Sequence, residues 1–344
     1  MNKWLANLGF QIFTLFSIVS VVFFLFSTSF PDPSTELIGQ NTDKETQQAI
    51  VNELGLDKPL YKQYLYYIND LSPISIQKEA SPNTLSLFAW NNNNIVLKLP
   101  YLRRSFQSRE LVSSILLEGF KNTAILALCS ILIASIVGIL FGIISGLNPG
   151  NWFSKIIVIL SMIGISAPSF FVAIIFSWFF GYLISDLTHL PMVGNIYETN
   201  LSGDNVLAIK NIILPSLVLG IRPLSIITQL MRNSILEEKN KDYITLAKSK
   251  GLNARNIIKN HLLPNAINPV LTSISGWFAS LLAGAFFVEF VFNWRGLGLI
   301  TIEALEKSDL PVLIGSILLT STLFIVINSF LQNIYRVIDP RIEP

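Results

Sequence analysis

Residues 242–264 read DYITLAKSKGLNARNIIKNHLLP, a polar, lysine-rich segment between strongly apolar stretches. Tyr243, Ile244 and Ala247 are spaced to share one face of a helix. Lys250 falls near the end of that helix, where a cation suits the helix dipole. The segment therefore predicts a short amphipathic helix between two apolar spans.

Gly251 marks the end of this helix. Glycine suits the left-handed position after a helix, and Leu252 is then the apolar residue that follows it. Asn253 suits the cap of a second short helix, and Leu263-Pro264 suits the first turn of the next span. The resulting helix-turn-helix has exposed apolar residues. It predicts either a protein-binding surface or a basic loop lying on anionic lipid.

The composition indicates a membrane protein. Of the 344 residues, 51% are hydrophobic and 13% are charged, whereas a soluble domain carries about 25% charged residues. The net charge of +2 is too small to indicate nucleic-acid binding. The single cysteine, Cys129, lies in an apolar stretch, which excludes a disulfide within the chain.

Six apolar stretches are long enough to cross a bilayer, which takes about 20 residues. They cover residues 8–29, 123–147, 156–184, 212–231, 266–291 and 311–335. The first stretch has an alternative reading as a signal peptide, because Ser27 and Ser29 imitate a small-x-small cleavage site. Its apolar run exceeds the roughly 7–15 residues of a signal peptide, which favours an uncleaved anchor. We therefore expect an all-α polytopic membrane protein.

The distribution of Lys and Arg predicts the orientation. Seven of them lie between Arg232 and Lys259, whereas residues 185–211 hold only Lys210. Because short cytoplasmic loops are enriched in these cations, we expect both termini and the lysine-rich loop in the cytoplasm.

This topology gives four parts. They are an N-terminal transmembrane anchor (1–29), an extracytoplasmic segment (30–120), a core of five transmembrane helices (121–335) with a cytoplasmic loop (236–264), and a cytoplasmic tail (336–344). In the outer segment, residues 54–71 predict a short amphipathic helix after Pro59. Residues 72–96, rich in Asn, Ser and Pro, predict a loop, with a hairpin as the alternative.

Two features inside the spans predict local geometry. Gly138, Gly142 and Gly146 repeat every four residues, which allows a neighbouring helix to approach closely. Pro168 lies within the third span and should kink it.

The spacing of Ala247, Gly251 and Leu263-Pro264 resembles the cytoplasmic coupling loop, or EAA motif, of binding-protein-dependent ABC importer permeases. Nearly the whole chain resembles the B-type permease subunit of dipeptide/oligopeptide importers. The stretches that carry this likeness are LGLDKPLYKQYL from Leu54, NTAIL from Asn122, GISAPSF from Gly164, EFVFNWRGLG from Glu289 and DPRI from Asp339.

Four features depart from the family pattern. Thr245-Leu246-Ala247 stands where the general motif has Glu-Ala-Ala, His261 occupies a place that is usually apolar, and Arg295 stands where many relatives have Pro. Residues 72–99 resemble an insertion.

The resemblance implies the type I ABC importer permease fold, with peptides or similar small solutes as cargo. It implies four kinds of partner: a second homologous permease, two ATPase subunits that use ATP and Mg, an extracytoplasmic binding protein and membrane lipid. It implies no cofactor on this chain, which also lacks a phosphate-binding G-x-x-x-x-G-K-[ST] segment. Nickel complexes, glutathione and sugars are alternative cargoes. The residues expected in the ATPase-coupling loop are Asp242, Tyr243, Ala247, Lys250, Gly251, Leu252, Leu263 and Pro264.

Arg222, Pro168 and Glu289 are candidates for a translocation path or gate. Arg222 is a cation deep in a span, where charges usually face a cavity or a partner. Its alternatives are a structural ion pair, a bond to carbonyls freed near Pro223, a contact with a peptide carboxylate, or the interface with the second permease. For Glu289, near the outer mouth, a solvated helix end is the alternative to a gate or interface residue.

Other function classes find little support. His189 and His261 are the only histidines, and they lie in loops on opposite sides of the membrane. An intramembrane protease and a metal site are therefore disfavoured, because no catalytic pair or ligand cluster is evident. A non-transporting membrane scaffold is the remaining alternative.

The topology is testable by cysteine labelling after Cys129 is replaced. We expect a cysteine at Ser86 to react with a membrane-impermeant maleimide from outside intact cells. A cysteine at Asn240 should react only after permeabilisation. The reverse pattern would contradict the predicted orientation.

Overall fold

The computed structural model of the chain describes residues 2–29, 58–77, 85–90, 93–98, 100–199, 203–283 and 285–338. The chain forms two compact units. Unit 1 comprises Met1–Gly119 and Ile300–Thr322, and unit 2 comprises Phe120–Leu299 and Leu323–Pro344.

Four described helices are long and apolar enough to cross a membrane. They are α1 (Asn2–Ser29), α5 (Val112–Leu147), α9 (Lys210–Glu238) and α16 (Leu310–Ile338). Two bent groups of helices pass the same test. One is α6 (Trp152–Ser166) with α7 (Ser169–Trp178), and the other joins α11 (Ala254–Ile257), α12 (Leu263–Ala266) and α13 (Asn268–Ala283). The described residues thus hold four to six candidate spans, and counting each bent group as one span gives the six predicted crossings. The predicted all-helical membrane architecture is confirmed.

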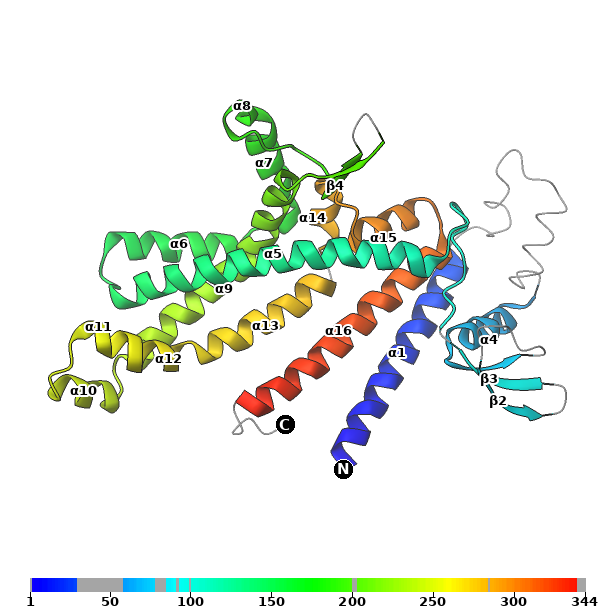
Figure 1. Cartoon of the computed structure of the whole chain (residues 1–344), viewed down its shortest axis with the longest axis horizontal. Helices are drawn as coiled ribbons and strands as arrows, with labels where there is room; N and C mark the ends of the chain where they lie inside the picture. The colour runs from blue at the N-terminus through cyan, green and yellow to red at the C-terminus, as the bar shows by residue number, and fades with distance from the viewer. Residues whose placement is uncertain are drawn as a thin grey trace. The chain divides into compact units, whose positions relative to one another are not determined.

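In unit 1, α4 (Leu60–Leu71) packs along α1, which confirms the short helix predicted after Pro59 (Figure 1). The ring of Phe23 lies 5.4 Å from the rings of both Tyr64 and Tyr67. The hydroxyls of Ser20 and Tyr64 share a hydrogen bond of 2.6 Å. The aromatic side chains therefore join the anchor helix to the segment that follows it.

Unit 1 also contains a small antiparallel sheet of order β1-β3-β2, formed by β1 (Ile74–Gln77), β2 (Leu85–Trp90) and β3 (Asn93–Leu97). The alternative of a hairpin is confirmed by the β2–β3 pair, whereas the predicted loop is wrong over these strands. The alternating apolar residues of ISIQ favour a strand, but the surrounding Asn, Ser and Pro obscured that pattern.

The core of unit 2 is built around α9. A close contact between α5 and α9 confirms the predicted role of the three glycines. A Cβ at Gly138, Gly142 or Gly146 would meet Ile227, Met231 or Ile235, respectively, at 2.5–2.9 Å. These three side chains are buried, and α6, α7 and α13 pack on other parts of α9.

The predicted third span is broken rather than straight. The axes of α6 and α7 differ by 110°, a much sharper change than the expected kink. Ala167 and Pro168 are both extended, with ψ of 130° and 129°. Proline disfavours a helical conformation in the residue before it, so the break falls at this pair. A π-helical turn, η1 (Phe179–Leu183), and α8 (Ser185–Thr188) follow α7.

The predicted fifth span, residues 266–291, also divides. Helix α13 ends at Ala283, and the separate helix α14 (Phe286–Val291) follows Ala285, which has a non-helical ψ of 20°. A third difference concerns the second span, because α5 begins at Val112 rather than near Thr123. Its 36 residues correspond to roughly 54 Å, longer than the roughly 30 Å hydrocarbon core.

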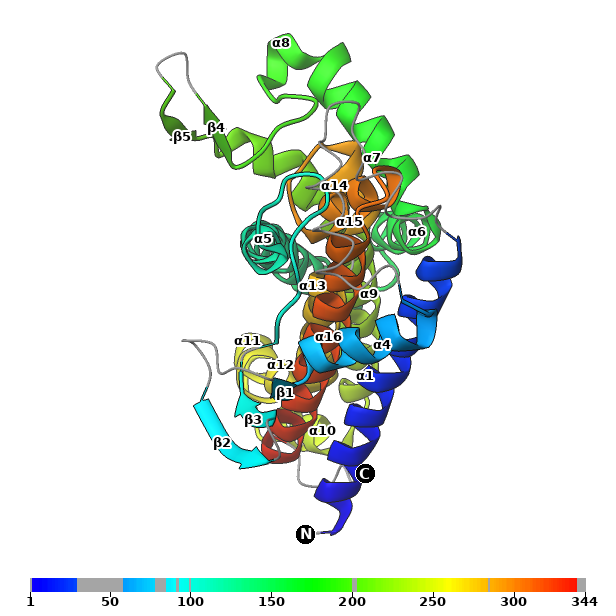
Figure 2. The same ribbon diagram turned by 90° about the vertical axis from the view of Figure 1, so that its right-hand side faces the viewer.

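The loops of unit 2 lie at two opposite ends (Figures 1 and 2). One end carries α8 and the hairpin of β4 (Tyr197–Thr199) and β5 (Asn205–Leu207). The other end carries α10 (Asp242–Ser249), α11 and the π-helical turn η2 (Ile258–Leu262). This separation agrees with a helix, α9, that crosses between the two loops.

The contact between α5 and α9 is testable by one pair of matched substitutions. Gly142→Ala should lower the melting temperature of the detergent-solubilised chain, because its Cβ would overlap Met231 and overpacking typically costs 1–3 kcal/mol. Gly276→Ala in α13 meets nothing within 4 Å and should leave the melting temperature unchanged or raise it, since alanine favours helices. Equal melting temperatures for the two variants would contradict the close contact.

Candidate functional site: a helix-turn-helix at one end of unit 2

The turn between α10 and α11 has the geometry predicted from Gly251. This residue has a φ of +76°. Its N–H donates to the carbonyl of Lys248 at 2.9 Å, and the N–H of Leu252 donates to the carbonyl of Ala247 at 3.3 Å. These two bonds form a Schellman motif. A Cβ at Gly251 would meet nothing within 4 Å, so its backbone conformation, rather than space, requires glycine here.

The second helix begins as predicted. The Asn253 side chain caps α11 by accepting a hydrogen bond from the N–H of Asn256 at 2.8 Å. Pro264 does not start a new helix as predicted, because α12 continues directly from α11 through the π-helical turn η2. Leu263 is half-buried and packs on the core of unit 2.

The first helix is fixed to the end of α9. The carboxylate of Glu238 accepts hydrogen bonds from Lys241 Nζ at 2.5 Å and from the hydroxyl of Tyr243. Partial burial, and then the bond to Glu238, raise the pKa of Tyr243 to about 12. The hydroxyl therefore remains a hydrogen-bond donor at physiological pH. Lys239 Nζ also donates to the carbonyl of Leu147 at 3.3 Å. Hydrogen bonds therefore join the start of α10 to the end of α9, and the end of α9 to the end of α5.

The apolar face of α10 is not exposed, which corrects one expectation. Ile244 and Ala247 are only 2% and 5% exposed and pack into the core of unit 2. A bulky residue at Ala247 would therefore disturb the chain's own packing. The apolar side chains that do face outward are Leu246 and Leu252, at 57% and 39% exposure. Leu246 was overlooked, although an apolar residue on the polar face of a helix is a signal for a contact surface.

The remaining loop residues, Asp242 and Lys250, are exposed. The outward surface of α10 and its turn therefore combines Leu246 and Leu252 with charged side chains of both signs. We call these two leucines the outward pair. Such a surface is suited to contact with another protein.

Arg222 lies on α9 with its side chain exposed. It makes no hydrogen bond or ion pair within the part of the chain that the structure describes, so the structural ion pair and the bond to carbonyls near Pro223 are not observed there. Pro168 lies at the break between α6 and α7. These two candidates do not lie on the helix-turn-helix.

Glu289 is fully buried in unit 2, so the alternative of a solvated helix end is wrong. Its carboxylate accepts hydrogen bonds from Thr123 Oγ1 at 2.7 Å and from the N–H groups of Gly298 and Leu299 at 2.7 and 3.2 Å. A Cβ at Gly296 would lie 2.5 Å from the carboxylate carbon. Glu289, on α14, therefore joins the first turn of α15 (Leu297–Glu306) to Thr123 on α5.

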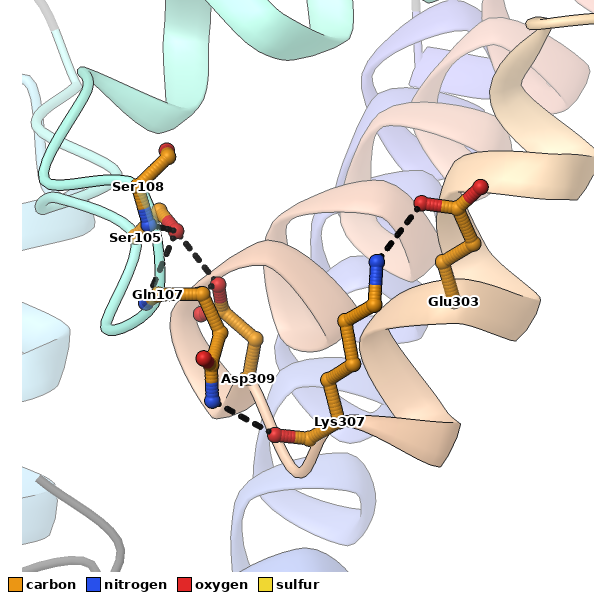
Figure 3. Close-up of polar contacts among 6 residues, drawn as sticks. All are labelled: Ser105, Gln107, Ser108, Glu303, Lys307 and Asp309. Carbon is orange, nitrogen blue, oxygen red and sulfur yellow. Dashed lines mark hydrogen bonds and ion pairs between the residues drawn. The ribbon is translucent and has the colours of Figure 1, made fainter. Parts of the chain in front are cut away.

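A second buried carboxylate, Asp309 in unit 1, was missed by the sequence analysis. It accepts a hydrogen bond from Ser105 Oγ at 2.5 Å (Figure 3). It also accepts hydrogen bonds from the N–H groups of Phe106 and Gln107 at 3.1 and 3.4 Å. The Gln107 side chain also donates to the carbonyl of Lys307 at 3.0 Å. The loop before α5 is thus tied to the segment between α15 (Leu297–Glu306) and α16. Asp309 directly precedes Leu310-Pro311, a pattern typical of a helix start.

An open polar hollow lies at the opposite end of unit 2 from the helix-turn-helix. Its polar lining includes Asp186 and His189 near α8, Glu198 on β4, and Lys210 and Asn211 at the start of α9. The Asn211 side chain donates to Glu198 Oε1 at 2.6 Å. Among the described residues, no group of three His, Cys, Asp or Glu side chains is placed to hold a metal ion.

Two protein-family models match the sequence, and they cover two regions of the same kind of protein. Residues 138–344 match "Binding-protein-dependent transport system inner membrane component". Residues 5–127 match the corresponding N-terminal region.

Several relatives match over nearly the whole chain. It is 32% identical to the di/tripeptide transport system permease protein DppB of Pseudomonas aeruginosa (strain UCBPP-PA14), covering 98% of this chain and 97% of that protein. It is 32% identical to the dipeptide transport system permease protein DppB of Escherichia coli (strain K12), covering 98% of each. It is 31% identical to the glutathione transport system permease protein GsiC of Escherichia coli O6:H1, covering 96% and 95%.

One solved structure supports the fold. The MetNI methionine ABC transporter in inward-facing conformations matches with a TM-score of 0.52 and 15% identity. The match covers 66% of this chain and 97% of that one. At this identity the likeness concerns the fold alone.

The stabilising role of the buried Glu289 carboxylate can be tested by comparing two Glu→Gln substitutions. Glu289→Gln should lower the stability of the solubilised chain by about 1–3 kcal/mol, because the amide would place a donor against the donors that the carboxylate accepts from. Glu303→Gln should change it by no more than about 1 kcal/mol, since Glu303 forms only an exposed ion pair with Lys307 at 3.2 Å. Thermal unfolding of both variants checks this, and a smaller loss at Glu289 than at Glu303 would contradict the assignment.

Proposed function

Because the chain belongs to the family of binding-protein-dependent transport system inner membrane components, we propose that this permease moves short peptides inward and that the helix-turn-helix couples it to a separate ATPase. The chain is the membrane component of such a transporter and not its ATPase. The observation that carries the coupling proposal is the Schellman turn at Gly251 next to a helix fixed to the end of α9.

Peptides are the cargo class best supported by the relatives. The similar permeases are named for dipeptides, for di- and tripeptides and for glutathione, itself a tripeptide. Nickel complexes and sugars lack such support among these relatives. A non-transporting scaffold is disfavoured by the family membership.

The partners follow from the class of transporter. We propose that the chain pairs with a second, homologous permease in the bacterial inner membrane. Two cytoplasmic ATPase subunits bind ATP and Mg, and an extracytoplasmic binding protein delivers the solute. This chain contributes no nucleotide site and no cofactor of its own.

The orientation follows from the two ends of unit 2. The end with α10 and α11 carries the lysine-rich loop and faces the cytoplasm, together with both termini. The opposite end, with α8 and the polar hollow, faces outward toward the binding protein.

Coupling uses rigid connections within unit 2. The ATPase contacts the outward pair, Leu246 and Leu252, while Ile244 and Ala247 hold α10 on the permease. When the ATPase subunits close, α10 moves with them. The hydrogen bonds of Glu238 carry that movement into α9. Since α9 continues through the membrane, it carries the motion to the translocation path.

The test uses the left-handed turn. Gly251→Val should abolish ATP hydrolysis stimulated by the binding protein and ATP-driven peptide uptake. A β-branched residue at this φ costs on the order of 1–2 kcal/mol and would turn Leu252 away from the ATPase. The measurements are uptake and ATPase activity of the whole transporter in proteoliposomes.

Gly251→Asn is the matched control, because asparagine tolerates the left-handed conformation. It should retain most of both activities at the same membrane level. Normal uptake in Gly251→Val, with normal insertion and assembly, would contradict the coupling role of this turn.

A further inference from the structure

Arg222 is isolated from both ends of α9. It lies twelve residues after Lys210, the first residue of α9, and sixteen before Glu238, the last, which at a rise of 1.5 Å per residue places it roughly 18 and 24 Å from them. A side chain that far from both helix ends cannot place its charge in the headgroup region by snorkelling. A lipid phosphate is therefore excluded as its counter-ion.

No acidic side chain in the described part of unit 2 is placed to pair with Arg222. Glu237 and Glu238 lie at the far end of α9, fifteen and sixteen residues away. Glu289, in α14, is buried, and its carboxylate already accepts three hydrogen bonds. Asp186 and Glu198 lie in the loops at the opposite end from α10. A cation in a membrane span is costly unless it is paired. The anion that pairs with Arg222 therefore comes from outside the described part of this unit.

The surroundings of Arg222 define an open strip on α9. Asn211, Pro215 and Val218 precede it on the same face at helical spacing, and all three are buried. Arg222 is exposed, and the same face then continues with Ile226 and Gln229, which are half-buried, and with Asn233, which is exposed. The protein therefore covers this face up to Val218 and leaves it partly open from Arg222 toward α10.

The opposite side of the helix is occupied. Ile227, Met231 and Ile235 pack against the glycines of α5. The open strip is thus a defined face. It has the Arg222 guanidinium at its start and Ile226 and Gln229 after it, and it ends at Asn233, whose side-chain oxygen accepts a hydrogen bond from Arg232 at 3.3 Å. It begins on the same continuous helix that is fixed to α10.

We propose that Arg222 binds the carboxylate of the transported solute midway through the membrane, an inference that rests on the proposed peptide cargo. The planar guanidinium forms paired hydrogen bonds with a carboxylate. The neutral Gln229, further along the strip, accepts or donates hydrogen bonds without adding charge. A site with one cation at its start binds an anion weakly enough for it to leave, as passage requires. Arg222 is in this sense a specificity-determining residue for solutes with a free carboxylate.

The test uses the complete transporter in proteoliposomes, with radiolabelled dialanine as the first probe. Arg222→Gln should reduce dialanine uptake at least tenfold, whereas Arg222→Lys should retain at least half of it. Arg295→Gln, at another exposed arginine of unit 2, should leave uptake unchanged. Binding-protein-stimulated ATP hydrolysis and co-purification of the second permease should be unchanged in all three variants.

Dialanine amide, which lacks the carboxylate, is the second probe. Where the wild type carries it, its uptake should change less than twofold in Arg222→Gln. Where the wild type does not carry dialanine amide, the inference is tested by comparing the dialanine uptake of Arg222→Gln with that of Arg222→Lys. Equal loss of both solutes, unchanged dialanine uptake in Arg222→Gln, or equal loss in the Gln and Lys variants would overturn the inference.

Two other outcomes have distinct meanings. Loss of the second permease from purified Arg222→Gln complexes would overturn the inference and assign Arg222 to the subunit interface. Failure of the wild type to carry any short peptide would contradict the proposed cargo, a result independent of Arg222.

Discussion

The close approach of α5 to α9 is the constraint on which unit 2 depends. Lipid is as apolar as a leucine side chain, so membrane helices gain little from apolar burial against one another and rely on tight packing. Glycines at positions 138, 142 and 146 remove the Cβ atoms that would meet Ile227, Met231 and Ile235. With one side held in this way, α9 presents its other sides to α6, α7 and α13. The two helices that meet at Pro168, α6 and α7, both pack on α9, and Arg222 lies on α9 itself.

Two buried carboxylates serve the same structural purpose in separate units. Glu289 and Asp309 each accept two backbone N–H groups together with one hydroxyl. The N–H groups come from the first turn of α15 for Glu289 and from the loop before α5 for Asp309. A buried carboxylate without such donors would be costly. In return, backbone donors that no helix or sheet bond satisfies find an acceptor. An acidic residue near a span is therefore as well suited to hold a turn in place as to contact a solute.

Local rules predicted much of this fold, and the failures arose where packing decided the outcome. The six spans, the left-handed Gly251, the cap at Asn253 and the contact of the three glycines all depend on spacing or backbone preference. Ala247 was expected to be exposed, but it packs into the core of unit 2. The angle of the bend at Pro168 was not predicted, because a proline indicates where a helix breaks and not by how much. The strand at residues 74–77 was missed because a four-residue strand forms only with its partner. The role of Asp309 was missed because its donors lie some 200 residues away in sequence. That Arg222 has no ionic partner among the described residues became visible only once the positions of the acidic groups were known.

The apolar side chains of the helix-turn-helix have two roles, internal packing and outward contact. Ile244 and Ala247 hold the loop on its own subunit, whereas Leu246 and Leu252 face outward. Under the proposed docking, the outward pair determines which ATPase binds, whereas the folding of the loop depends on Ile244 and Ala247. After gene duplication, one copy of such a permease can therefore acquire a different ATPase by exchanging surface side chains alone. Its cargo path and its folding would be inherited without change.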